Sequence, residues 1–190
     1  EDSFKMFSRK CIWQQASSKS LPSCILSDPD ITLGPMASPS LAKLVRKQIS
    51  TAIEKGAKPH IERFAKDDGE AYLSPQILTN VNHEMDIMRE ENFGPVVGVM
   101  PVNDDIEAIR MMNDSHYGLT ASLWTGNLKR AEQIGKRVET GTVFMNRADY
   151  LDPALCWTGC KDTGRSGALS TIGYQNLTRP KSFHLKKLMS

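Results

Sequence analysis

Apolar residues recur at helical spacing between residues 41 and 53. They are Leu41, Leu44, Val45, Ile49, Ala52 and Ile53, which fall on one face of a helix. Ser38 can cap this helix, Pro39 suits its first turn, and Gly56 supplies a left-handed residue to close it. The pattern therefore predicts an amphipathic helix that begins after Ser38 and ends before Gly56.

Strand and helix patterns alternate from residue 94 to residue 145. Short apolar runs at residues 96–100, 119–124 and 142–145 are typical of strands. The first intervening helix begins at Asp104 and Asp105, and its apolar residues are Ile106, Ile109 and Met112. The second helix is capped by Asn127 and ends at Gly141. Its apolar residues are Leu128, Ala131, Ile134 and Val138. This order predicts an α/β fold with a mostly parallel sheet and helices on both faces. Residues 57–65 and 71–81 form two further extended stretches around a polar turn at residues 66–70.

The alternation of strand and helix patterns ends after residue 145. Residues 146–167 are rich in Gly, Pro, Asp and aromatic side chains, and they follow the end of a predicted strand. Open α/β sheets bind ligands at that end, and long loops there are often functional. In residues 178–188, Phe183 and Leu185 alternate with His184 and Lys186, which predicts an edge strand able to pair with a neighbouring sheet or subunit.

Composition excludes several classes of protein. The chain has 190 residues, 39% of them apolar and 24% charged, with a formal net charge of +2. Such a chain can fill a core, and its interspersed lysines and arginines argue against a nucleic-acid partner. No apolar run approaches the roughly 18–20 residues that span a bilayer, so no membrane partner is expected. Four cysteines are too few for a disulfide scaffold, which favours a reducing, cytoplasmic location. Because residue 1 is Glu, we expect the chain to be a piece of something longer.

The cysteines raise two chemical possibilities. Cys156 and Cys160 have a spacing seen in metal sites, but no second Cys/His pair accompanies them, which favours two incidental thiols over a zinc site. Cys11 lies on an apolar helical face, and Cys24 lies in a polar loop without a nearby His. Neither has a visible base to activate a thiolate, so no catalytic residue is assigned. The chain also lacks the glycine motifs that cradle phosphates.

Two features have both a structural and a functional interpretation. Glu90 and Glu91 come before a Phe-Gly-Pro turn at residues 93–95, where a strand begins. They are either the solvated end of a helix or part of a fixed bend that presents a carboxylate and an aromatic ring. Trp157 is either a loop residue folded onto the core or the wall of an apolar pocket.

Five segments, taken in order, closely resemble the aldehyde dehydrogenase superfamily. They read D-P-D-I-T-L-G-P at 28–35, E-E-N-F-G-P-V at 90–96, N-D-S-H-Y-G-L-T-A-S at 113–122, E-x-G-T-V-x-x-N at 139–146, and W-T-G-C-K-D-T-G-R at 157–165. The resemblance covers residues 28 to 188. It implies an aldehyde-dehydrogenase catalytic-domain fold, with residues 1–27 as a divergent segment, 28–178 as the C-terminal portion of the catalytic domain, and 179–190 as a terminal oligomerisation strand.

The resemblance also implies a chemistry. Family members oxidise an aldehyde to a carboxylic acid: a cysteine attacks the aldehyde to form a thiohemiacetal, a hydride passes to NAD or NADP, and water hydrolyses the thioester. In this chain Glu91 would hold the nicotinamide ribose hydroxyls, a role that suits a carboxylate acceptor. Phe93 would pack against the nicotinamide, and Asp149, Leu151 and Trp157 would line the substrate entrance. The implied partners are a small-molecule aldehyde and further copies of the chain, in a dimer or tetramer joined through the C-terminal strand.

The chain also departs from the family pattern. By that pattern the nucleophilic cysteine, the general-base glutamate, the oxyanion asparagine and the dinucleotide-binding domain are expected upstream of Glu1. Residues 9–26 do not follow the family, and a Trp-Thr-Gly run at 157–159 stands where Phe-Gly-Gly is usual. Two functions therefore stay open. The chain is either the C-terminal catalytic part of an NAD(P)-dependent enzyme, inactive by itself, or an inactive module that associates with full-length subunits.

Overall fold

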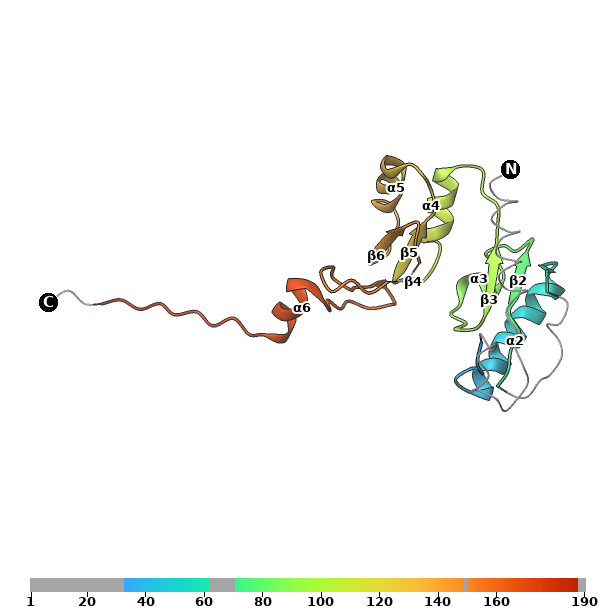
Figure 1. Cartoon of the computed structure of the whole chain (residues 1–190), viewed down its shortest axis with the longest axis horizontal. Coiled ribbons are helices and arrows are strands. Elements are labelled where there is room, and N and C mark those ends of the chain that lie inside the picture. The colour runs from blue at the N-terminus through green and yellow to red at the C-terminus, as the bar shows by residue number, and fades with distance from the viewer. Residues whose placement is uncertain (1–32, 62–70, 149, 188–190) are drawn as a thin grey trace. The chain divides into compact units, whose positions relative to one another are not determined.

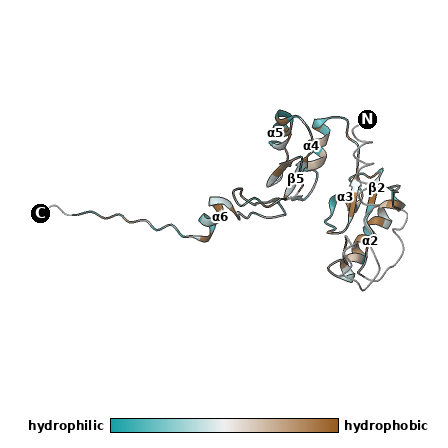
Figure 2. Cartoon of the chain, in the orientation of Figure 1, coloured by the Kyte–Doolittle hydropathy of each residue, from teal (hydrophilic) through white to brown (hydrophobic). Residues whose placement is uncertain are grey.

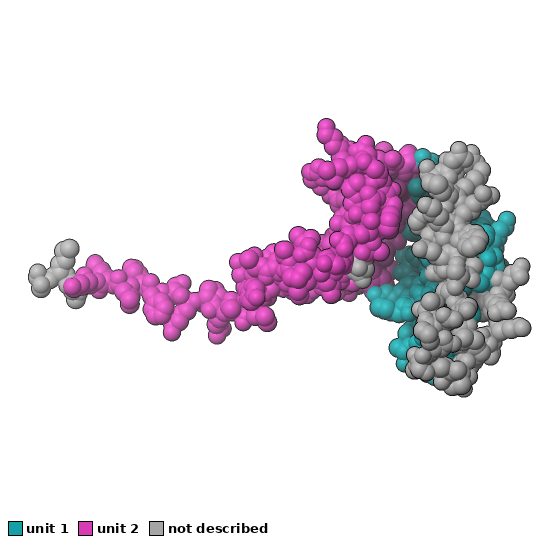
Figure 3. Space-filling model, viewed as in Figure 1, with its two compact units in different colours: residues 1–103 teal, residues 104–190 magenta. Residues whose placement is uncertain are grey.

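The computed structural model describes residues 33–61, 71–148 and 150–187 (Figure 1). The chain divides into two compact units, residues 1–103 and residues 104–190, which are coloured separately in Figure 3. Cys11, Cys24, the polar turn at residues 66–70 and Asp149 lie outside the described residues. Among the residues that are described, no helix is both long and apolar enough to cross a membrane.

The first helix of unit 1 confirms the capping prediction. Helix α2 spans Pro39–Glu54, and the Ser38 side chain accepts a hydrogen bond from the Leu41 amide at 3.2 Å. Gly56 follows with a φ of 101°, a conformation that favours glycine. The buried face consists of Ala42, Val45, Gln48, Ile49 and Ala52. Leu44 is 47% exposed because it lies about 100° around the helix from Val45, off this face.

Unit 1 contains a three-stranded sheet. Its strands are β1 (Lys58–Pro59), β2 (Gln76–Thr79) and β3 (Val96–Val99), in that spatial order. Strand β1 is antiparallel to β2, and β2 is parallel to β3 with Gln76 opposite Val96. The short helix α3 (Asp86–Arg89) lies between β2 and β3 in the chain. Buried residues of α2, β2 and α3 form one core, and Figure 2 shows apolar residues concentrated along α2 and β2.

Unit 2 confirms the next two helices. Helix α4 spans Asp105–Asn113, and the Asp104 carboxylate accepts from the Glu107 amide at 2.8 Å. Helix α5 spans Leu128–Gly135, with the Asn127 side chain accepting from the Arg130 amide at 3.0 Å. The remaining elements are β4 (Tyr117–Gly118), β5 (Thr120–Leu123), β6 (Thr142–Met145), β7 (Cys160–Lys161) and helix α6 (Ser170–Leu177).

The strands of unit 2 pair in two separate ladders. Strand β5 is parallel to β6, with Thr120 opposite Thr142, and β4 is antiparallel to β7. A small core of Ile109, Ala121 and Val138 lies at the β5–β6 pair. Two details differ from the sequence pattern. Ile106 is 66% exposed although it was expected on the apolar face, and Val138 is buried although α5 ends before it.

The segment expected as a C-terminal edge strand forms no strand within this chain. Residues 178–187 follow α6 as an exposed segment without assigned secondary structure, and no described strand pairs with them (Figure 1), so pairing with another subunit stays a prediction. Phe183 is 72% exposed and Leu185 is 86% exposed. The alternating pattern indicates a β-strand only if a neighbouring strand supplies hydrogen bonds, and the described part of this chain offers none.

Candidate functional site

The loop at residues 91–95 connects the region after α3 to β3, and three hydrogen bonds hold its backbone. The buried side chain of Gln48 donates from Nε2 to the Glu91 carbonyl at 3.4 Å. The Asn92 side chain accepts from the Gly94 amide at 3.0 Å. The Pro95 carbonyl accepts from the Gln76 amide at 2.8 Å. The bend between Glu91 and Pro95 is therefore built into the core of unit 1 rather than left to solvent.

Gly94 allows this loop to press against helix α2. A Cβ atom on Gly94 would lie 2.9 Å from Cγ1 of Val45 and 3.5 Å from Cδ2 of Leu73. The first distance is shorter than van der Waals contact, so any side chain here would push the loop away from α2. The Phe-Gly-Pro motif therefore needs a glycine at position 94, because the loop packs closely against Val45 of helix α2.

Phe93 is held in an unusual conformation. Its φ is 43°, in the left-handed region that non-glycine residues rarely adopt, and its side chain is 79% exposed. Such a backbone costs on the order of 1–3 kcal/mol and persists only where its surroundings impose it. A large apolar ring held out of the core on a strained, anchored loop is typical of a ligand-binding position.

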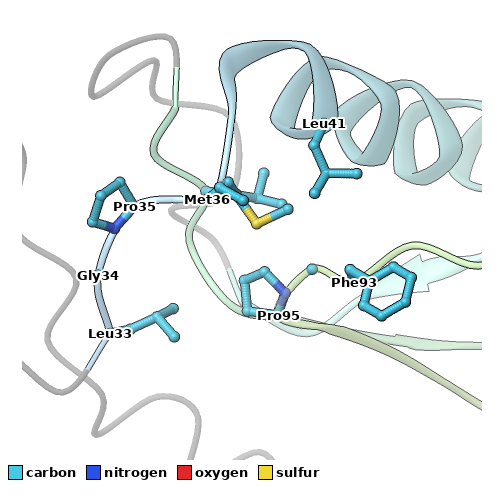
Figure 4. A pocket seen from close by; sticks show the side chains of 10 residues that line it. Leu33, Gly34, Pro35, Met36, Leu41, Phe93 and Pro95 are labelled. Carbon is cyan, nitrogen blue, oxygen red and sulfur yellow. The ribbon is translucent and has the colours of Figure 1, made fainter.

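An apolar pocket of about 610 Å³ lies beside this loop. It is lined by residues 33–37, Leu41, Leu73 and residues 93–95, all within unit 1. Figure 4 shows the Phe93 and Pro95 side chains below Leu41, with Met36 between Leu41 and Pro95. The carboxylate of the loop comes from Glu91, which is exposed. The site therefore combines an apolar hollow, an exposed ring and an exposed acid.

The expected substrate-entrance residues belong to unit 2. Leu151 is 60% exposed and Trp157 is half-buried. The Trp157 amide donates to the Ala168 carbonyl at 2.8 Å, and the Ala168 amide donates back to Trp157 at 3.0 Å. The structure thus brings Glu91 and Phe93 together on one loop, and Leu151 and Trp157 on one segment of the other unit. The roles assigned to these residues, and to Asp149, stay predictions.

Two contributors to the site were not singled out by sequence reasoning. Met36 lines the pocket from the segment before α2, and Gln48 holds the loop from within α2. Gln48 does leave a signal in the sequence, since it is a polar residue on the apolar stripe between Val45 and Ala52. Met36 lies in a non-periodic segment, and nothing in the pattern separates it from an ordinary loop residue.

The free thiols and the two ion pairs described next belong to unit 2. Cys156 and Cys160 are unbonded and half-buried, and the described residues contain no cluster of His, Cys, Asp or Glu that could hold a metal. In unit 2 the Arg130 guanidinium hydrogen-bonds the carboxylate of Asp105 and lowers its pKa. Lys136 likewise lowers the pKa of Glu132 through a hydrogen bond.

Comparison with known proteins identifies the class. The model of the aldehyde dehydrogenase family matches residues 14–183. The chain belongs to this family. It is 34% identical, over 82% of its length, to a succinate-semialdehyde dehydrogenase [NADP(+)] of Deinococcus radiodurans, of which it covers 32%. The chain thus spans about a third of that curated relative.

Solved structures agree with the architecture. A lactaldehyde dehydrogenase structure matches 93% of the chain, and 36% of that protein, with a TM-score of 0.84 at 29% identity. An aldehyde dehydrogenase of Mycobacterium tuberculosis complexed with NAD+ matches 87% of the chain, and 36% of that protein, with a TM-score of 0.74 at 29% identity. These likenesses confirm the α/β fold of aldehyde-dehydrogenase catalytic-domain type.

Proposed function

We propose that the chain is part of an NAD(P)-dependent oxidoreductase that converts an aldehyde to a carboxylic acid. Its contribution is to position the nicotinamide end of the cofactor and to form one wall of the substrate entrance. The observation that carries the proposal is Phe93, whose exposed ring is held by a strained and anchored backbone beside an apolar pocket. Glu91 and Phe93 would hold the nicotinamide end of the cofactor, which would supply the hydride acceptor for oxidation of the aldehyde.

The residues of the loop fit this end of the cofactor. The exposed Glu91 carboxylate can accept hydrogen bonds from two ribose hydroxyls, and the exposed Phe93 ring can pack against a flat heterocycle. Because Gln48 and Gln76 already hold the backbone, little loop entropy has to be lost on binding. Both NADP and NAD occur among the relatives, in the name of the Deinococcus radiodurans enzyme and in the Mycobacterium tuberculosis structure.

On the substrate side, Leu151 and Trp157 provide apolar surface for the carbon chain of an aldehyde. Asp149 follows strand β6 and precedes both of these residues in the sequence. Neither Leu151 nor Trp157 can act as a nucleophile, so their proposed contribution is to orient the substrate.

The proposal places the protein in the cytoplasm, as its few cysteines indicate.

The proposal is tested by binding oxidised nicotinamide mononucleotide to the 190-residue chain, followed by saturation-transfer NMR. Glu91→Gln and Phe93→Ala should each weaken the transfer to the ribose and nicotinamide protons. Glu90→Gln and Phe183→Ala are matched controls, since they alter an adjacent exposed acid and an exposed ring elsewhere. Equal losses in the control variants, or no transfer to the wild-type chain, would overturn the proposal.

A second candidate is an inactive module that associates with full-length subunits. The observation in its favour is the exposed segment 178–187, in which Phe183 and Leu185 have no cover among the described residues. In this case the chain should shift the sedimentation of a full-length family member without changing its NADH production. A chain that forms NADH from an aldehyde by itself would exclude this candidate.

A further inference from the structure

The ammonium group of Lys161 is surrounded by acceptors from two other segments. Its Nζ donates to the carbonyls of Asn113 at 2.6 Å and Ser115 at 3.0 Å, and lies 2.8 Å from the Glu139 carboxylate. Its side chain is only 23% exposed. An ammonium has three donors, and here each has an acceptor. The group therefore joins the end of α4, the segment before β6 and strand β7.

The residues next to Lys161 reinforce this junction. The Asp162 amide donates to the His116 carbonyl at 2.9 Å, and the Thr163 hydroxyl accepts from the Gly118 amide at 2.9 Å. Lys161 itself has a φ of 55°, a left-handed backbone that bends the chain at this point. The tip formed by residues 161–163 is thus bound to residues 113–118 through several independent contacts.

The same loop carries Trp157. Paired hydrogen bonds between Trp157 and Ala168 close the base of the loop, while Lys161 holds its tip. Between them, the Thr158 carbonyl lies so near Gly141 that a Cβ there would be 1.7 Å from it. A loop that is hydrogen-bonded at its base and its tip, and packed closely against Gly141 between them, leaves the Trp157 backbone little freedom.

We propose that Lys161 is a positioning residue for the substrate entrance: its ammonium holds the loop 157–168 so that Trp157 stands as a wall for the aldehyde's carbon chain. The wall role of Trp157 rests on the function proposed above, whereas the hold on the loop does not. Loss of the ammonium would leave the Glu139 carboxylate and two carbonyls without their shared donor, which favours opening of the loop. Lys161 acts through Trp157 and need not touch the substrate.

The first test measures how accessible Trp157 is, in a 190-residue chain in which Trp13→Phe and Trp124→Phe leave Trp157 as the single tryptophan. Lys161→Ala should raise the acrylamide quenching constant of Trp157 about twofold while the far-UV circular dichroism stays unchanged. Lys161→Arg, or n-butylammonium added to Lys161→Ala, should restore part of the protection. Lys136→Ala is the matched control, because Lys136 forms a 2.7 Å ion pair with Glu132 that is exposed and lies within one helix.

An unchanged quenching constant in Lys161→Ala would overturn the proposal, as would failure of both Lys161→Arg and n-butylammonium to restore protection. If Lys161→Ala does not fold, Glu139→Gln weakens the same junction from the other side, and an unchanged quenching constant of Trp157 in that variant would overturn the proposal. A second readout separates this inference from the proposed function, namely quenching of Trp157 by hexanal. If hexanal does not quench Trp157 in the wild-type chain, Trp157 does not line the substrate entrance. The acrylamide quenching constants still decide whether Lys161 holds the loop in place.

Discussion

Gln48 in helix α2 donates its side-chain amide to the main-chain carbonyl of Glu91, 43 residues further along the chain. The bond is 3.4 Å long, and the Oε1 atom of the same side chain is buried with no hydrogen-bond partner among the described residues. The candidate cofactor loop is therefore held by a glutamine that is itself only partly satisfied. A buried acceptor without a partner costs about 1–3 kcal/mol, so Gln48 is not explained as a purely stabilising residue.

Replacing Gln48 should separate stability from loop order. In Gln48→Met the unpartnered oxygen and the weak hydrogen bond disappear together, so the free energy of unfolding in urea should change by less than about 1 kcal/mol. The Gly94 amide should nevertheless exchange its hydrogen faster, because the loop has lost its contact with α2. Ile49→Val, a core change on the same helix, should lower stability by about 0.5–1.5 kcal/mol without this local effect. A large loss of stability in Gln48→Met with unchanged exchange at Gly94 would contradict the assignment.

Gly94 should not tolerate a side chain. Gly94→Ala places a Cβ 2.9 Å from Val45 Cγ1, and we expect the free energy of unfolding to fall by about 1–3 kcal/mol. Val45→Ala should also be destabilising by itself, since Val45 is fully buried. The double variant should be less destabilised than the sum of the two single variants, because removal of the valine methyls makes room for the alanine. Strict additivity in the urea titrations would show that the close contact is not the cause.

The 190-residue chain by itself should not form NADH from aldehydes. A cysteine nucleophile requires a base or another group that lowers its pKa, and neither Cys156 nor Cys160 has a hydrogen-bonded base among the described residues. The assay uses a panel of short and aromatic aldehydes with NAD+ or NADP+, monitored at the absorbance of NADH. Turnover that disappears in Cys11→Ser would contradict this expectation and identify Cys11 as the nucleophile.

The chain should associate with itself through its C-terminal segment. Residues 178–187 expose Phe183 and Leu185 together with unpaired backbone groups, and such edges tend to find a partner strand. Sedimentation velocity at micromolar concentration should show species larger than a monomer, and deletion of the residues after Arg179 should reduce them. A monomer in both samples would show that this segment does not mediate assembly.

The pair formed by Asp105 and Arg130 should make stability depend on pH in the acid range. The hydrogen bond from Arg130 lowers the pKa of Asp105 in the folded chain below its ordinary value of 3.8. The contribution is therefore present above pH 3.8 and is lost as the pH falls through the lower, folded-state pKa. Asp105→Asn should be less stable than wild type near pH 6, and the difference should shrink toward pH 2. Because the pair is exposed, the difference should be small and should fall further in high salt. A constant difference from pH 6 to pH 2 would show that the ion pair is not its source.

Local features of the structure could be predicted because their causes lie within a few residues of one another. Ser38, Asp104 and Asn127 each cap a helix whose first amides are three positions away, so the starts of α2, α4 and α5 follow from the sequence. Strand β6 was likewise predicted with its observed bounds, Thr142–Met145. The order and spacing of the motifs were also sufficient to indicate the family, which the comparison confirms.

The site depended on contacts between residues that are distant in the chain. The left-handed Phe93, the buried Gln48 and the parallel pairing of β3 with β2 result from packing in unit 1, and no local pattern specifies them. Lys161 reaches an acceptor 48 residues earlier, so its role could not be inferred from charge alone. The C-terminal segment has the alternating pattern of a strand in its sequence but forms no strand in the described structure, because a strand needs a partner strand to become part of a sheet. The sequence by itself determined the local elements and the family, and the tertiary structure decided which side chains are buried, strained or joined, because those properties arise only when distant segments pack together.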